Sequence, residues 1–187
     1  MTIETMSEEM KDLLGRWKMG DQFDLPLAST CIVAGAYSGR VMELLDEIYS
    51  PERIIGFEPQ FWVFQEAWQR LRYRTNCLVV PWGISAGEEG LFPMGEFNTD
   101  GCSFVNVGSR EQGSGWLVET RKALDTFRIG SVDLAVFNME GYEYKLMPYL
   151  IEQNLHRSFD RFAVQFHTAF GTDEVYKKIC LMLDPTH

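Results

Sequence analysis

Residues 30–58 read TCIVAGAYSGRVMELLDEIYSPERIIGFE, and this stretch decides the fold. Consecutive apolar residues predict strands, buried on both faces, over 31–34 and 54–57. Between them, the small residues of Gly35–Gly39 predict a tight turn, and an apolar stripe predicts a helix over 40–48. We therefore expect a β-α-β unit that begins a parallel sheet.

Two features at the tips of these strands predict a cofactor that contains adenosine. The turn residues Gly35, Ala36, Tyr37 and Gly39 would leave backbone N–H groups at the helix N-terminus free to face a polar ligand. Glu58 lies 19 residues after Gly39 (58 − 39), where a carboxylate can accept hydrogen bonds from both hydroxyls of a ribose. The alternative interpretation is an ordinary α/β turn with a solvated Glu58.

The rest of the chain continues to alternate between strand and helix patterns. Apolar aromatic residues at helical spacing, Phe61 and Trp68 among them, should pack the next helix against the sheet. Glycines break the pattern between Trp82 and Thr120, where 90–94 and 103–107 are expected to pair. The other expected elements are helices over 7–18, 60–73, 142–153 (with a bend or an early end at Pro148) and 173–183, and strands over 77–80, 132–137 and 162–166.

This alternation predicts a single α/β domain over 1–187, with a parallel sheet covered by helices on both faces. It comprises an N-terminal helix and loop (1–29), the core (30–167) and a C-terminal helix (168–187). Ligands of such sheets bind beyond the carboxyl ends of the strands. The groups expected there are Gly35–Gly39, Glu58-Pro59, Trp82-Gly83, Asn138–Glu140 and His167.

Composition narrows the classes of partner. The net charge is −10 and no basic stripe is present, which argues against nucleic acid. The four cysteines are scattered without a metal-binding spacing, so we expect no metal site and a reduced, cytoplasmic protein. No apolar run approaches the length of a membrane span, and the N-terminus lacks a signal-peptide pattern.

The motifs at the strand tips also resemble a known family, the FkbM-type S-adenosylmethionine-dependent methyltransferases. The resemblance extends from about Cys31 to His167, and its Phe-Glu-Pro and Glu-Gly-x-Glu blocks are its more specific parts. The motifs that carry it are Gly35-Ala36-x-x-Gly39, Gly56-Phe57-Glu58-Pro59, Gly83-Ile84-Ser85, Leu124-Asp125, Asp133 and Glu140-Gly141-x-Glu143.

The resemblance implies a Rossmann-like class I methyltransferase fold and methyl transfer from S-adenosylmethionine to a hydroxyl of a small or carbohydrate-like molecule. It implies that the glycine turn lines the methionine half of the cofactor and that Glu58 holds the ribose. Pro59, Trp82 and Gly83 complete the predicted cofactor site. His167 and Glu140 are the candidate proton acceptors, with His167 favoured because the intrinsic pKa of histidine lies near neutrality, and Asn138 could orient the acceptor hydroxyl. The structural alternatives are that Glu140 caps the following helix and that His167 hydrogen-bonds a neighbouring loop.

The sequence departs from the family pattern at positions that the family usually keeps charged. Val33, Val136, Asn138 and Gln165 stand there instead. A catalytically impaired binding or scaffold protein is therefore an alternative, and a nicotinamide-dependent oxidoreductase is a third. The sheet is expected to be trimmed at its C-terminal edge, since too few residues follow His167 for two more strands, and a second subunit could cover that edge.

Overall fold

The computed structural model describes residue 25 and residues 29–96, 102–105, 111–167, 171 and 173–183. Five parallel strands form the central sheet in the order β3-β2-β1-β8-β9. The chain runs outward from β1 to β3 and then returns to β8 on the other side of β1, so strand order reverses between β1 and β8. The strands are β1 (Thr30–Ala34), β2 (Arg53–Phe57), β3 (Cys77–Val80), β8 (Leu134–Phe137) and β9 (Phe162–Val164).

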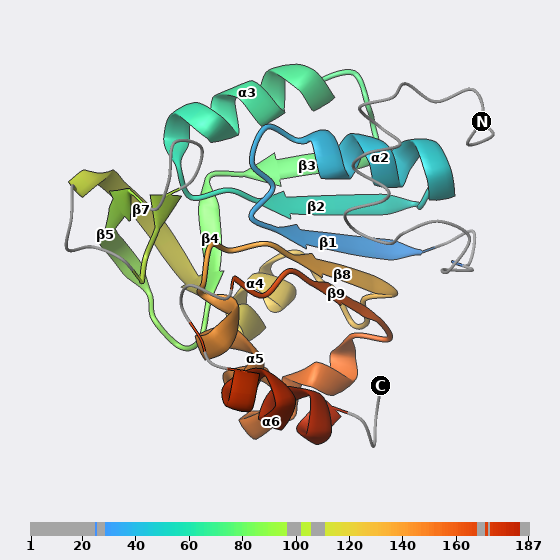
Figure 1. Cartoon of the computed structure of the whole chain (residues 1–187). Coiled ribbons are helices and arrows are strands. Elements are labelled where there is room, and N and C mark those ends of the chain that lie inside the picture. The colour runs from blue at the N-terminus through green and yellow to red at the C-terminus, as the bar shows by residue number, and fades with distance from the viewer. Residues whose placement is uncertain are drawn as a thin grey trace.

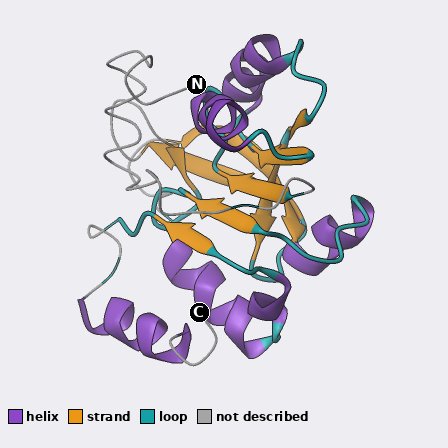
Figure 2. Cartoon of the chain, turned by 90° about the vertical axis from the view of Figure 1, so that its right-hand side faces the viewer, coloured by secondary structure: helices purple, strands orange, loops and turns teal. Residues whose placement is uncertain are grey.

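Helices cover both faces of this sheet, as predicted (Figures 1 and 2). Alternate residues of each strand point to opposite faces. Cys31 and Val33 therefore pack with α2 and α3, whereas Ile32 and Ala34 pack with α4, α5 and η2. The helices are α2 (Arg40–Tyr49), α3 (Phe61–Leu71), α4 (Thr120–Thr126), α5 (Glu143–Glu152), the 3-10 helix η2 (Leu155–Ser158) and α6 (Asp173–Leu183).

The glycine-rich stretch after β3 forms a second sheet, in the order β4-β7-β5-β6. The predicted pairing of 90–94 with 103–107 is wrong in its main partner, because β5 pairs along its length with β7 and only Gly95 and Glu96 pair with β6. β4 begins two residues after β3 ends (82 − 80), which places this sheet beyond the ends of the parallel strands (Figure 1). Its strands are β4 (Trp82–Ser85), β5 (Gly90–Glu96), β6 (Cys102–Ser103) and β7 (Glu111–Glu119).

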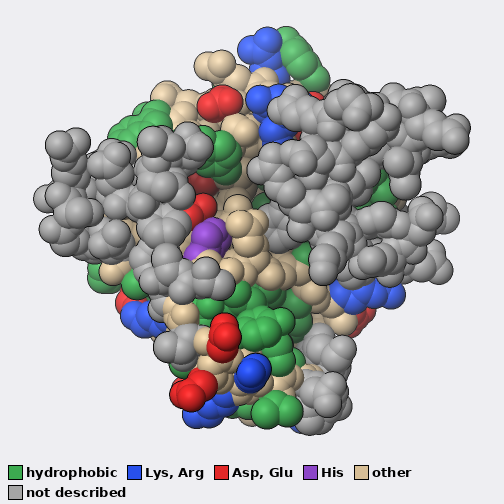
Figure 3. Space-filling view, in the orientation of Figure 1, with side chains coloured by type: hydrophobic (Ala, Val, Ile, Leu, Met, Phe, Trp, Pro, Cys, Tyr) green, Lys and Arg blue, Asp and Glu red, His purple; other side chains and the backbone are tan. Residues whose placement is uncertain are grey.

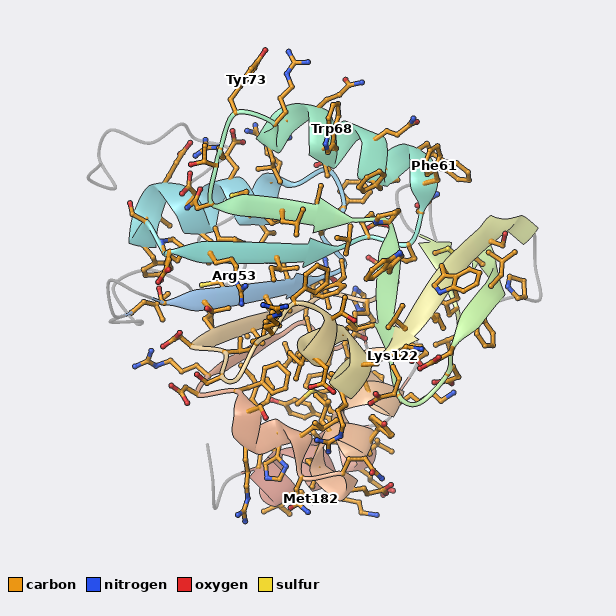
Figure 4. The ribbon with its side chains drawn as sticks, turned by 180° about the vertical axis from the view of Figure 1, so that it is seen from behind. Arg53, Phe61, Trp68, Tyr73, Lys122 and Met182 are labelled. Carbon is orange, nitrogen blue, oxygen red and sulfur yellow. The ribbon has the colours of Figure 1, made fainter. Side chains whose placement is uncertain are left out.

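Two helices differ from the sequence prediction. In α3 the buried residues are Val63, Ala67 and Leu71, whereas Phe61 and Trp68 are 56% and 54% exposed and project away from the sheet (Figure 4). The apolar arc of this helix is wider than the sheet can cover. α5 does not end at the proline within it, because the burial of its apolar residues outweighs the missing backbone hydrogen bond.

The two ends of the predicted domain can be compared with the structure only in part. The helix predicted over 7–18, and all but two residues of the N-terminal segment (residues 1–29), lie outside the described residues. Within the described ranges, β9 is the edge strand and pairs only with β8, which agrees with a trimmed sheet. None of the described helices is long and apolar enough to cross a membrane.

A very close backbone approach in the sheet generates the first prediction. A Cβ atom on Gly35 would lie 1.8 Å from the backbone oxygen of Asn138, and Gly35 has a φ of +78°. Gly35→Ala should therefore lower the free energy of unfolding by roughly 2–6 kcal/mol. Gly130→Ala is the control, because nothing lies within 4 Å of its Cβ position. Urea unfolding of both variants measures this, and equal stabilities would contradict the close approach.

Candidate functional site

The glycine turn joins the ends of three strands. The backbone N–H groups of Gly35 and Ala36 both donate to the carbonyl of Phe57 at 3.0 Å, and the N–H of Asn138 donates to the carbonyl of Ala34 at 2.9 Å. Gly39 begins α2 with a φ of +82° and packs against α3. Contacts within the protein therefore explain why glycine stands at both positions. The turn lies against the tip of β8.

Glu58 is buried at the tip of β2, so the alternative of a solvated side chain is wrong. Its Oε2 accepts from the backbone N–H of Tyr37 and its Oε1 from that of Gln60, both at 2.9 Å. Burial raises the pKa of Glu58 from the ordinary 4.5 to about 7, although the two backbone donors oppose that rise. Tyr37 is exposed and has a φ of +48°, so the carboxylate stabilises a strained turn residue.

The tip of β8 carries two buried acceptor atoms. Oδ1 of Asn138 and Oε2 of Glu140 are inaccessible to solvent and accept no hydrogen bond from any described residue. Glu140 has a φ of +51°, a conformation that a residue with a side chain rarely adopts. Buried acceptors without donors, next to a strained residue, are typical of a functional site.

His167 lies between two carboxylates. Its Nδ1 is 3.2 Å from Oε1 of Glu143, and its Nε2 is 3.4 Å from Oε2 of Glu140. Burial lowers the pKa of His167, but the hydrogen bond that its ring donates to Glu143 and the charges of both carboxylates together raise that pKa above its ordinary value. Burial also raises the pKa of Glu140. Figure 3 shows histidine and acidic side chains together near the centre of one face of the molecule.

Sequence reasoning missed the role of Glu143, which it noted only as part of the Glu-Gly-x-Glu block. This side chain is fully buried at the start of α5. It accepts hydrogen bonds from the backbone N–H groups of Met139 and Gly141, which fixes the turn after β8. A glutamate near a helix N-terminus, a few residues past a strand tip, was the available signal.

The second sheet forms a wall against this turn. Ser103 of β6 is buried, and its hydroxyl donates to the backbone oxygen of Glu140 at 2.7 Å. The ring of Phe104 stands edge-on to that of Tyr142, with centroids 6.4 Å apart. No local pattern signals these contacts, because they depend on how two distant segments pair.

The predicted cofactor residues fall into two groups. Gly35, Ala36, Tyr37, Gly39 and Glu58 are brought together by the contacts above. Pro59 and Gly83 pack against each other, since a Cβ on Gly83 would lie 3.3 Å from the Pro59 ring. The side chain of Trp82 instead packs against Phe127, with ring centroids 5.9 Å apart. It therefore has a packing role in the core, and its cofactor role stays a prediction.

Comparison with known proteins finds relatives in structure but none in sequence. No protein-family model matches the sequence, and no curated protein does. Three of the solved structures that are similar in fold illustrate this. A chain of the fibrillarin/NOP5P complex has a TM-score of 0.57 at 14% identity, covering 93% of this chain and 69% of that one. The FkbM methyltransferase of Methylobacillus flagellatus KT has a TM-score of 0.56 at 13% identity, covering 87% and 40%. Aeropyrum pernix fibrillarin, solved with natively bound S-adenosyl-L-methionine, has a TM-score of 0.52 at 17% identity, covering 93% and 64%.

At these identities the likeness shows the fold alone. This chain has the Rossmann-like fold of the class I methyltransferases, as the sequence predicted. It spans less than half the length of the FkbM protein. Membership of the FkbM family stays a prediction.

The raised pKa of Glu58 generates a prediction on stability. Because the folded state binds the proton more tightly than the unfolded state, this group stabilises the fold below pH 4.5, and that stability is lost as the pH rises through about 7. The difference corresponds to roughly 3 kcal/mol. Between pH 4.5 and 7.5, wild type should lose that much more unfolding free energy than Glu58→Gln. His167 and Glu140 are present in both proteins, so their effects cancel. Parallel curves for the two proteins would contradict the raised pKa.

Proposed function

We propose that this protein is an S-adenosylmethionine-dependent methyltransferase that acts on a hydroxyl of a small or carbohydrate-like molecule. One observation carries the proposal. At the switch point of a class I methyltransferase fold, a strained turn carries buried acceptor atoms and stands beside a histidine paired with two carboxylates. Packing alone does not require this arrangement, because Oδ1 of Asn138 and Oε2 of Glu140 are buried and accept no hydrogen bond from the described residues, although Oε2 of Glu140 lies 3.4 Å from Nε2 of His167.

The residues present fit the cofactor. An ionised carboxylate oxygen accepts about two hydrogen bonds, and each oxygen of Glu58 uses one for a backbone N–H, so each retains capacity for a ribose hydroxyl. The Gly35–Gly39 turn would line the methionine half. The carboxylates of Glu140 and Glu143 supply negative charge, which suits a cationic ligand. When bound, S-adenosylmethionine supplies a methyl group that its sulfonium activates toward nucleophiles.

The chain's own residues would then align the acceptor and take its proton. The side-chain amide of Asn138 would orient the acceptor hydroxyl, and alignment is the larger requirement for this reaction. His167 accepts the proton at Nε2, because an amide cannot. Its raised pKa means that activity should fall as the pH drops through that pKa. Ser103 and the second sheet form the wall against which an acceptor packs.

Two alternatives make different demands on the site. A nicotinamide-dependent oxidoreductase could use Glu58 for its ribose and His167 for a proton, but the turn of this chain lacks the third glycine of the Gly-x-Gly-x-x-Gly pattern that receives a dinucleotide. A scaffold protein would need neither the buried acceptors nor the paired histidine. We place no nucleic acid in the site, because the chain carries a net charge of −10.

Calorimetric titration tests the proposal. S-adenosylhomocysteine should bind and NAD should not. Glu58→Ala should weaken binding by roughly 2–3 kcal/mol, because two charge-assisted hydrogen bonds to ribose are lost. Glu52→Ala is the matched control, since it removes an exposed carboxylate next to the opposite end of β2. Heat with NAD alone would favour the oxidoreductase, and no heat with either ligand at millimolar concentration would reject the proposal.

A further inference from the structure

The buried carboxylate of Glu143 faces only hydrogen-bond donors among the contacts that the structure shows. Its Oε2 accepts from the N–H of Gly141 at 2.9 Å, and its Oε1 accepts from the N–H of Met139. The same Oε1 lies 3.2 Å from Nδ1 of His167. Both backbone contacts hold the carboxylate in place, and the third is attractive only when Nδ1 carries a hydrogen.

The other ring nitrogen has different surroundings. Nε2 of His167 lies 3.4 Å from the amide nitrogen of Gln165 and 3.4 Å from Oε2 of Glu140. The amide nitrogen of Gln165 can only donate a hydrogen bond. When the His167 ring is neutral, this donor is satisfied only if Nε2 carries the lone pair. In the charged ring, Nε2–H can instead face Glu140. The two neighbours therefore match the two protonation states that a proton acceptor passes through.

From this geometry we propose that Glu143 is the positioning residue of the site: it holds the proton of neutral His167 on Nδ1 and so leaves Nε2 as the atom that accepts a proton. This inference rests on the proposed function for its purpose, but the arrangement itself exists without cofactor or acceptor. Glu143 touches no substrate in this scheme, and it acts through His167 and through the turn that carries Glu140. Glu140 faces Nε2 and stabilises the charged ring.

The inference also explains why the turn after β8 is built as it is. The carboxylate that orients His167 is the one that accepts from Met139 and Gly141, on either side of the strained Glu140. The orientation of the ring and the position of Glu140 are therefore set by one buried group. A substitution there should alter both sides of the imidazole.

Side-chain nitrogen NMR of the histidines tests this on the cofactor-free protein. The chain has three histidines, so the His167 signals are identified by their loss in His167→Gln. Above its pKa, His167 of wild type should show a protonated Nδ1 and an unprotonated Nε2. Glu143→Gln should lower the pKa of His167 and move its neutral proton toward Nε2. Glu140→Gln should lower the pKa while the proton stays on Nδ1.

A purely structural Glu143 would lower the melting temperature without moving the proton. If wild-type His167 carries its neutral proton on Nε2, or if Glu143→Gln folds and leaves both pKa and tautomer unchanged, the inference is wrong. Should Glu143→Gln fail to fold, the wild-type tautomer and the Glu140→Gln spectrum decide the matter. The measurement uses neither cofactor nor turnover, so its failure is distinct from a failure to bind S-adenosylhomocysteine.

Discussion

The buried carboxylate of Glu143 is the constraint on which the site depends. A fully buried acid must have its acceptors satisfied, and here two backbone N–H groups and an imidazole do this. Satisfying it fixes the path of the chain after β8, the strained conformation of Glu140 and the place of His167. The positions of the groups proposed to act in the reaction therefore follow from the need to satisfy one buried carboxylate in the folded chain.

A second constraint brings the cofactor turn to this place. Only glycine fits at position 35, because the backbone oxygen of Asn138 occupies the space of a side chain. The turn after β1 and the turn after β8 are therefore in direct contact at the switch point of the sheet. Glu58 lies at the same edge of the sheet and accepts a hydrogen bond from the backbone N–H of Tyr37. The second sheet contacts this edge through Ser103, which donates to the backbone oxygen of Glu140.

The sequence predicted the central sheet well, because its strands are apolar runs that end at glycines or polar tips. It also predicted that Glu140 and His167 would lie at neighbouring strand tips, where they are 3.4 Å apart, whereas the contacts of Glu58 are with Tyr37 and Gln60 and its place in one site with them stays a prediction. It failed where long-range pairing decides, as in the partner of β5, and where an apolar arc is wider than its contact, as at Trp68. It underrated Glu143 because burial of a carboxylate is not visible in a sequence pattern.

A crystal structure of the protein with S-adenosylhomocysteine tests the central claim most directly, namely that this edge of the sheet is a methyl-transfer site. We predict the ribose hydroxyls on the carboxylate of Glu58, the homocysteine half along Gly35–Gly39, and the sulfur on the side of Asn138 and His167. The claim is contradicted if the ligand binds elsewhere, or if it binds here with its sulfur turned away from His167.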